Sequence, residues 1–435
     1  MPPSSLRPFR HRDFRLLWSA SAFSSIGTWM QAVAVGAYVT QETGQARWTA
    51  LVAVAAFLPI GLLTPVGGAL ADRLDRRKWM AAGVAVEALL AALLTVLSAT
   101  GRASPGAVTA VVFANGCIAA IVLPFYQAMI PDLVSKDDLL GAAALGSAQY
   151  NLGRVLGPAL AAVLVAATSY SWAFAVNTVS FFAVIAALLL IRLPDTRAPA
   201  DGLGIVARVR AGARAAWAEP GCRTPLILIA VVAFLLAPFI ALIPAKAHEL
   251  VGGGLKDTAA ATGVLTTAQG IGAVVGALLI APLADRFGRR RLIAGFIVVS
   301  SLAIAVYGVM PSVPLAAAAL VVVGGSYIGI LSGMNTVVQL RAPAEFRGRI
   351  LSLYFMGLGS IYPIGGLLQG ALADRVGLAT TVVAFAAAML VVLAFIWTTR
   401  PHLLHALNDP PRPEVGIDAA AVAEDVAVAP EVRTV

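Results

Sequence analysis

The chain has few charged residues. Asp, Glu, Lys and Arg make up 12% of its 435 residues, whereas hydrophobic residues make up 59%. Soluble globular domains carry about 25% charged residues. With half of that share, most of the chain cannot face water, so a soluble domain is excluded as its overall architecture.

Cysteine is also scarce. Cys117 falls in a predicted span and Cys222 in a predicted loop, so neither a disulfide nor a metal site is expected. The sequence contains no Walker loop, no H-E-x-x-H helix and no dinucleotide-binding fingerprint. These absences disfavour an ATP-driven pump, and with no nucleophile–base pair present we expect neither an enzyme nor a cofactor.

Long apolar runs dominate the chain instead. Twelve of them reach the roughly 20 residues that cross a bilayer, and they are continuous rather than alternating in polarity, which indicates helices and not barrel strands. We therefore predict an all-α membrane protein with twelve transmembrane helices in two pseudo-symmetric six-helix halves. The predicted spans are 14–42, 47–71, 79–100, 105–131, 145–168, 171–192, 224–250, 258–284, 291–311, 314–340, 347–373 and 377–398.

The basic residues are distributed unevenly along this topology. The net charge is +9, and 25 of the 31 Lys and Arg residues lie on the side that carries both termini. By the positive-inside rule that side is cytoplasmic. The basic excess is therefore explained by topology, and nucleic acid is not expected as a partner. The first apolar run is too long for a cleavable signal peptide.

The polar segments divide the chain. We predict an N-terminal half at 1–192, a cytoplasmic linker at 193–223, a C-terminal half at 224–400 and a disordered cytoplasmic tail at 401–435. Within the linker, residues 203–217 place apolar and basic side chains on different faces. This pattern fits an amphipathic helix on the membrane surface, and a plain tether is the alternative.

A charged loop occurs twice, once in each half. The copies cover residues 68–78 and 282–291, and their aspartates are 213 residues apart, about half of the chain. A repeated charged loop indicates a duplicated bundle, which is how many secondary transporters are built. The aspartates are Asp72 and Asp285, and the accompanying basic residues include Arg73, Arg77, Arg286 and Arg290.

The first copy resembles the G-x-L-A-D-R-x-G-R-R-K signature of the major facilitator superfamily, and the chain is similar to that superfamily over residues 10–400. Asp75 stands where the signature has a glycine. The resemblance implies that Asp72 docks at a neighbouring helix terminus and pairs with basic groups, latching the outward-open state. A carboxylate is favourable at a helix N-terminus, and a breakable lock is bistable. Alternatively, these charges only fix topology and loop shape.

Residues 153–158 resemble the G-x-x-x-G-P motif of export-type antiporters in the superfamily. Gly153 and Gly157 lie one turn apart and permit close approach of a neighbouring helix, and Pro158 kinks its own helix. We expect them to shape the moving interface and to favour export over uptake. A packing seam without directional meaning is the alternative.

Further segments are similar to the bacterial multidrug, macrolide and enterobactin exporter branch. They lie at 15–31, 131–139 and 341–349. Two features of related proteins are missing: Thr28 stands where many members have an acidic residue, and the fourth span has no Arg around Asn115. The coupling mechanism therefore cannot be transferred intact.

Ionisable residues within the spans are functional candidates by default. Arg154 in the fifth span could attract an anionic group of a substrate, or its side chain could extend to the inner interface. Glu87 in the third span is the proton-coupling candidate, although that span is expected to be a scaffold helix.

Neutral polar residues recur at helical spacing on several spans and indicate a cavity for weakly specific, amphipathic cargo. Hydrogen bonding between helices within each half is the alternative. With Arg154, the predicted cavity residues are Gln31, Tyr38, Asn115, Gln269 and Asn335.

Together these observations predict a monomeric secondary transporter of the bacterial inner membrane. It exports small amphipathic, drug-like compounds by proton antiport, driven by proton influx, and alternates access by rocking its halves in the lipid bilayer. The first alternative is a dedicated exporter of a siderophore or secondary metabolite. An alternative of another class is a membrane sensor or scaffold that does not transport.

Overall fold

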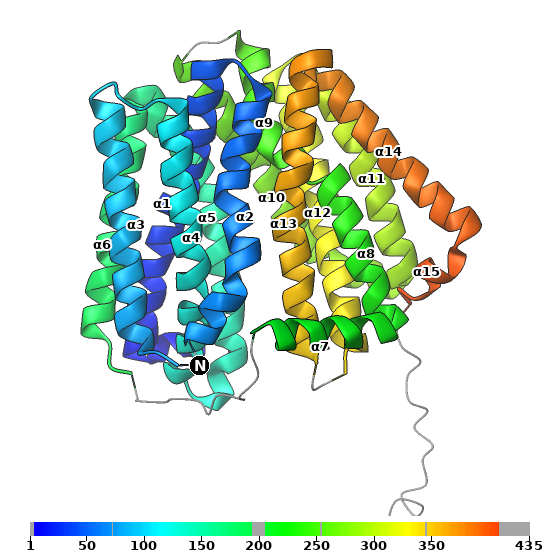
Figure 1. Cartoon of the computed structure of the whole chain (residues 1–435), viewed down its shortest axis with the longest axis horizontal. Helices are drawn as coiled ribbons and strands as arrows, with labels where there is room; N and C mark the ends of the chain where they lie inside the picture. The colour runs from blue at the N-terminus through cyan, green and yellow to red at the C-terminus, as the bar shows by residue number, and fades with distance from the viewer. Residues whose placement is uncertain (1–3, 72, 194–204, 253–254, 344–345, 409–435) are drawn as a thin grey trace, which may run out of the picture.

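The computed structural model describes residues 4–71, 73–193, 205–252, 255–343 and 346–408, and every regular element in these ranges is a helix (Figure 1). The α-helices are α1 (Arg12–Thr43), α2 (Ala46–Ala71), α3 (Arg76–Ala99), α4 (Pro105–Met129), α5 (Leu139–Ala167), α6 (Tyr170–Leu190), α7 (Ile205–Ala218), α8 (Pro220–Leu235), α9 (Phe239–Val251), α10 (Leu255–Phe287), α11 (Arg289–Val309), α12 (Val313–Arg341), α13 (Arg347–Val376), α14 (Leu378–Thr399) and α15 (Pro401–His405). Three 3-10 helices are η1 (Ser4–Arg10), η2 (Ile130–Asp132) and η3 (Lys136–Asp138).

Eleven segments of the described chain are long and apolar enough to cross a membrane, and α8 with α9 forms one of them. The helix α1 has 32 residues, which is long enough, but its Ser, Gly, Thr and Gln residues make it less apolar than the others. The predicted all-helical membrane protein is thus confirmed. The twelfth span and the division into two six-helix halves stay predictions.

One predicted span, 224–250, is divided by a turn between α8 and α9. The backbone N–H groups of Leu236 and Ala237 both donate to the carbonyl of Val232, at 2.9 and 3.0 Å. Pro238 follows and has no N–H to continue the helical ladder. The regular helical hydrogen bonding is therefore interrupted here, within the span that the sequence predicts as a single segment.

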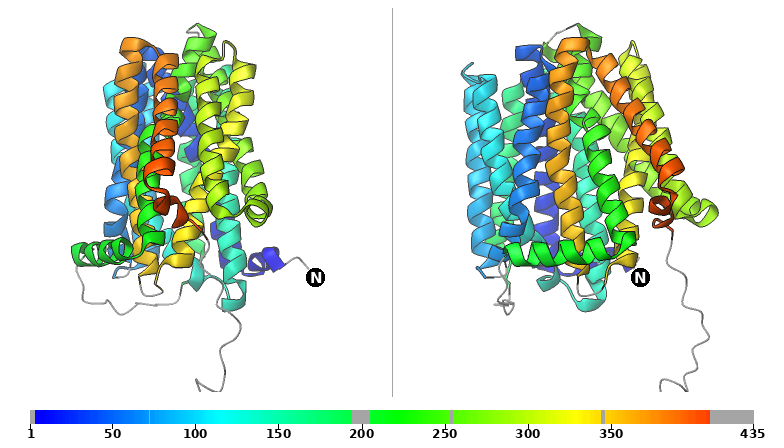
Figure 2. Two further views of the ribbon diagram at one scale, coloured as in Figure 1. Left: turned by 90° about the vertical axis from the view of Figure 1, so that its right-hand side faces the viewer. Right: turned by 45° about the vertical axis from the view of Figure 1, so that its right-hand side comes forward.

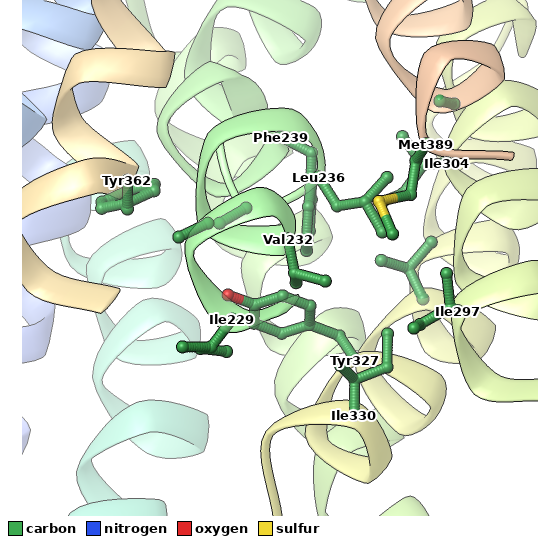
Figure 3. Packing of buried hydrophobic residues seen from close by; sticks show 14 of the residues in the cluster. Ile229, Val232, Leu236, Phe239, Ile297, Ile304, Tyr327, Ile330, Tyr362 and Met389 are labelled. Atoms are coloured by element: carbon green, nitrogen blue, oxygen red, sulfur yellow. The ribbon is translucent and has the colours of Figure 1, made fainter. Parts of the chain in front are cut away.

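The largest hydrophobic core lies among the helices from α8 to α14. Figure 3 shows Tyr327 of α12 beside Ile229 and Val232 of α8. The rings of Tyr327 and Phe239 meet edge to face with centroids 5.7 Å apart. Two smaller cores lie mainly among α1 to α6. The helices α1 to α6 form a first group and the helices α8 to α14 a second group, each with hydrophobic cores of its own. The contacts between the two groups are described below.

The helix α7 lies across one end of the bundle rather than along it (Figure 2). It packs against α8 and α13: Ala216 is fully buried, and a Cβ on Gly212 would lie 2.9 Å from the Cβ of Arg349. A helix at Ile205–Ala218 thus docks on the bundle, and its place on the membrane surface stays a prediction. We call the end that α7 covers the α7 end. The opposite end, where α1 turns into α2 and α13 into α14, is the far end (Figure 1).

Candidate functional site

A polar contact joins the two groups of helices near the middle of the bundle. Arg154 Nη2 of α5 donates to Gln269 Oε1 of α10 at 2.9 Å. Because α5 starts at Leu139, Arg154 lies halfway along its helix, deeper than the span limits predicted from the sequence imply. The structure therefore brings together two of the six residues predicted for the cavity.

The Gln269 side chain has unused hydrogen-bonding capacity. Gln269 is 2% exposed, and its Nε2 atom has no hydrogen-bond partner within the described ranges. Burying an amide donor without a partner is costly. A donor of this kind, beside a guanidinium, can bind an acceptor oxygen of a small molecule.

Aromatic side chains lie beside this contact. Tyr150 is 52% exposed and precedes Arg154 by four residues, so both side chains lie on one face of α5. Its ring meets Trp29 of α1 edge to face, with centroids 5.6 Å apart. One face of α5 thus presents a phenol and a guanidinium together.

Two other predicted cavity residues, Gln31 and Tyr38 of α1, form hydrogen bonds within the first six helices and their loops. Gln31 Oε1 accepts from Asn177 Nδ2 of α6 at 2.9 Å, and the Tyr38 hydroxyl donates to the carbonyl of Ala103. These contacts account for the polarity of both residues without a substrate.

Two predicted cavity residues differ from these in their contacts. Asn335 accepts from Gln339, one turn further along α12. The Oδ1 atom of Asn115 in α4 is buried and has no hydrogen-bond partner in the part of the chain that the structure describes. Asn115 therefore resembles Gln269 in holding a free polar atom.

The proton-coupling candidate Glu87 is buried on α3, with 8% of its surface exposed. It lies beside Val84 and Ala88, which belong to a hydrophobic core. No hydrogen bond or ion pair to its carboxyl is found among the residues described. A solitary buried carboxyl is costly when charged, so its proton-coupling role stays a prediction.

The glycine motif of α5 packs against α1. A Cβ on Gly153 would lie 2.3 Å from Ser25 Oγ, and one on Gly157 would lie 2.6 Å from Trp29 Cβ. Both glycines therefore make a close contact within the first group of helices. Pro158, the third residue of the motif, contacts the other group of helices instead: a Cβ on Gly263 of α10 would lie 2.6 Å from the carbonyl oxygen of Pro158.

The first charged loop is only partly described, because Asp72 lies outside the described residues. Arg77 donates to the Leu189 carbonyl at the end of α6, at 2.7 Å, and Arg73 is exposed. Arg76, which the sequence did not single out, makes the most contacts of the loop: it donates to Asp132 at 2.7 Å and to the Ala128 carbonyl at 2.9 Å.

The departure from the family signature at Asp75 has a local explanation. Asp75 is the N-cap of α3, and its carboxylate accepts the backbone N–H of Lys78 at 3.0 Å. This hydrogen bond lowers the pKa of Asp75, as expected for a carboxylate at a helix N-terminus. An aspartate here stabilises the start of α3.

The second charged loop has fewer contacts between its own members. Arg290 lies 2.7 Å from a ring nitrogen of His405 in α15, and the Arg286 guanidinium lies over the Phe287 ring. Asp285 is exposed and forms no ion pair with any described residue. The predicted latch roles in both loops stay predictions.

The close contacts between the two groups lie from the middle of the bundle to the far end. A Cβ on Gly61 of α2 would lie 2.8 Å from the backbone nitrogen of Ser360 in α13. Nearer the far end, Gly36 faces Pro244, with 3.0 Å from its ideal Cβ to Pro244 Cγ. In Figure 1 the ribbons of α2 and α13 lie closest towards the far end and diverge towards the α7 end.

The profile of one protein family, described as transmembrane secretion effectors, matches residues 3–428. The chain belongs to this family. The family is part of the major facilitator superfamily, so the chain is a multi-pass membrane transporter and not an enzyme, as the sequence predicted.

Relatives of this transmembrane secretion effector match over most of their length. It is 27% identical to the multidrug efflux pump Tap of Mycolicibacterium fortuitum over 385 residues, covering 87% of this chain and 93% of the relative. It is 23% identical to macrolide efflux protein A of Streptococcus pyogenes, covering 84% and 90%. A crystal structure of a mutant of the nucleoside transporter NupG superposes with a TM-score of 0.71 at 15% identity, covering 92% of this chain and all of that one. That likeness concerns the fold.

Proposed function

We propose that this protein exports small amphipathic compounds across the plasma membrane of a bacterium in exchange for protons. The observation that carries the proposal is the contact between Arg154 and Gln269. It joins the two groups of helices at mid-bundle, and the unpaired Gln269 donor and the exposed Tyr150 ring beside it suit cargo with both polar and aromatic parts.

In the proposed transport cycle the two six-helix halves rock against each other. The positive-inside rule assigns the α7 end to the cytoplasm. The close contacts between α2 and α13 from mid-bundle to the far end then correspond to a state that is closed outside and accessible from inside. Cargo binds near Arg154 from the cytoplasm, and rocking exposes it to the far end.

Two lines of support favour drug-like cargo over a single dedicated substrate. The two relatives described above are named a multidrug efflux pump and a macrolide efflux protein. Arg154 is also the one Lys or Arg residue that the sequence places more than five residues from the nearest end of a predicted span, and a strongly anionic siderophore would call for several cations.

Efflux of ethidium and of a macrolide, measured in an exporter-deficient bacterium that produces this chain, tests the proposal. We expect efflux that stops when a protonophore is added. Arg154→Gln removes the guanidinium and is expected to lower efflux at least about tenfold, since a hydrogen bond to a charged group contributes about 1.5–3 kcal/mol. Arg102→Gln, at an exposed loop residue, is the matched control and should export normally.

The outcomes separate the alternatives. If the membrane-inserted protein exports neither probe, drug export is refuted, and comparison of the metabolites retained by a deletion strain tests for a dedicated siderophore or metabolite exporter. If neither probe nor metabolite moves, a non-transporting sensor is the better interpretation.

A further inference from the structure

One hexapeptide occurs twice in the chain, at the ends of two helices that pack on each other. Gly-Ala-Leu-Ala-Asp-Arg forms residues 68–73 at the end of α2 and residues 370–375 at the end of α13. The helices α2 and α13 run in opposite directions along a shared contact. The described residues of the first copy, 68–71 and 73, therefore lie at the α7 end, and the second copy lies at the far end.

The aspartate of the second copy binds the start of α2. Asp374 Oδ1 accepts the backbone N–H of Ala46 at 2.7 Å, and Oδ2 accepts that of Arg47 at 3.2 Å. The first N–H groups of a helix have no partner within the helix, and its N-terminus carries a partial positive charge. A carboxylate from one half thus caps a helix of the other half.

The backbones are also in close contact at this point. A Cβ on Gly370 would lie 2.9 Å from the Ala46 carbonyl oxygen and 2.9 Å from the Ala50 Cβ, and Ala50 is fully buried. Beside this contact lies an open hollow of about 570 Å³, whose lining includes Asp374, Arg47 and His248. Water from the hollow can replace the carboxylate when the helices separate.

We propose that Asp374 is the far-end latch of the transporter, the counterpart of the latch that the family resemblance assigns to Asp72. It is a positioning residue: its two hydrogen bonds hold α2 against α13 while the far end is closed, and they break when that end opens. This inference rests on the proposed alternating access, and it assigns the two copies of one hexapeptide to the two ends of the pathway.

The test measures how readily a maleimide labels Ala50→Cys in purified, full-length protein that also carries Cys117→Ala and Cys222→Ala. Labelling requires the far end to open, because Ala50 is buried against α13. We expect Asp374→Asn to raise the labelling rate about 5- to 30-fold, the shift in an equilibrium that corresponds to 1–2 kcal/mol. Asp257→Asn, an exposed aspartate at the same end on the first turn of α10, should leave the rate unchanged.

A second variant changes the other side of the same contact. Ala46→Pro removes one donor N–H at the first position of α2, where proline is well tolerated, so it serves even if Asp374→Asn does not fold. It should also raise labelling, and with Asp374→Asn its effect should be less than additive. A melting temperature that falls while the labelling rate stays unchanged would overturn the proposal, because Asp374 would then only stabilise the fold. Labelling needs no substrate, so its result is independent of the efflux assay.

Discussion

Asp138 holds the N-terminal segment against the start of α5. Its side chain is 3% exposed and lies 2.8 Å from His11 Nε2 and 3.0 Å from Ser135 Oγ, with Arg10 at 3.8 Å. The hydrogen bond with His11 is the main cause of a lowered pKa at Asp138, against the opposing effect of burial. A carboxyl whose pKa is lower in the folded than in the unfolded state stabilises the fold at pH values above its unfolded-state pKa, which is about 3.9. That contribution is lost as the pH falls from this value through the lower pKa of the folded state.

We therefore predict an acid-sensitive contact at this aspartate. The melting temperature of the purified protein should fall as the pH is lowered from about 6 to below about 4. Asp138→Asn should melt lower at pH 7 and show a smaller fall on acidification. Asp257→Asn keeps Asp138 and should reproduce the acid dependence of the natural chain. Superimposable pH profiles of the two variants would refute this role.

At the residue scale, the sequence predicts which residues are candidates for the site better than it predicts which residues they contact. Arg154 is predicted because ionisable groups within spans are functional candidates, and Gln269 because polar residues recur at helical spacing on its span. Gln31 is predicted by the same spacing but accepts a hydrogen bond from Asn177 of α6. Helical spacing shows which residues share a face, but it does not say which neighbour that face meets. The contact of Asp374 with Ala46 joins residues 328 apart and has no local signal beyond the repeated hexapeptide.

At the scale of elements, the positions and lengths of the continuous apolar runs predict where the long helices lie. The predicted span limits and the helix ends differ by at most six residues. The turn between α8 and α9 was missed because Pro238 lies in an unbroken apolar run, where hydropathy alone gives no sign of a break. Proline is also tolerated inside α5, at Pro158, so its presence does not decide where a helix ends.

The glycines of α5 give a matched prediction at this scale. Gly157→Ala places a Cβ 2.6 Å from Trp29 Cβ and 2.9 Å from two backbone atoms of α1, which cannot move aside as a side chain can. We expect a loss of about 1–3 kcal/mol, the usual cost of overpacking, seen as a lower melting temperature. Gly146→Ala lies in the same helix with nothing within 4 Å and should be neutral or stabilising, because alanine favours helix. Equal melting temperatures for the two variants would contradict the close packing of α1 on α5.

At the scale of the whole molecule, the repeated hexapeptide allows the direction of the conformational bias to be tested. The glycine of its second copy, Gly370, has no room for a side chain while the far end is closed, since a Cβ there would lie 3.0 Å from Arg47 Cα. The equivalent glycine of the first copy, Gly68, has nothing within 4 Å. The two positions share a local sequence and differ in which end of the bundle they occupy.

Valine at position 370 and valine at position 68 should therefore shift the equilibrium between the far-end-closed and far-end-open states in opposite directions. Gly370→Val prevents α2 and α13 from closing at the far end, so Ala50→Cys should label faster than in the natural background, by about tenfold for a bias of 1.4 kcal/mol. Gly68→Val fits the state in which the far end is closed, because nothing lies within 4 Å of the added Cβ. If the α7 end closes by the same kind of contact, the valine hinders closure of the α7 end. Labelling of Ala50→Cys should therefore be unchanged or slower. Efflux should fall in both variants, because a cycle needs both states. Faster labelling in both variants would mean that valine merely loosens the bundle, and it would contradict reciprocal closure at the two ends.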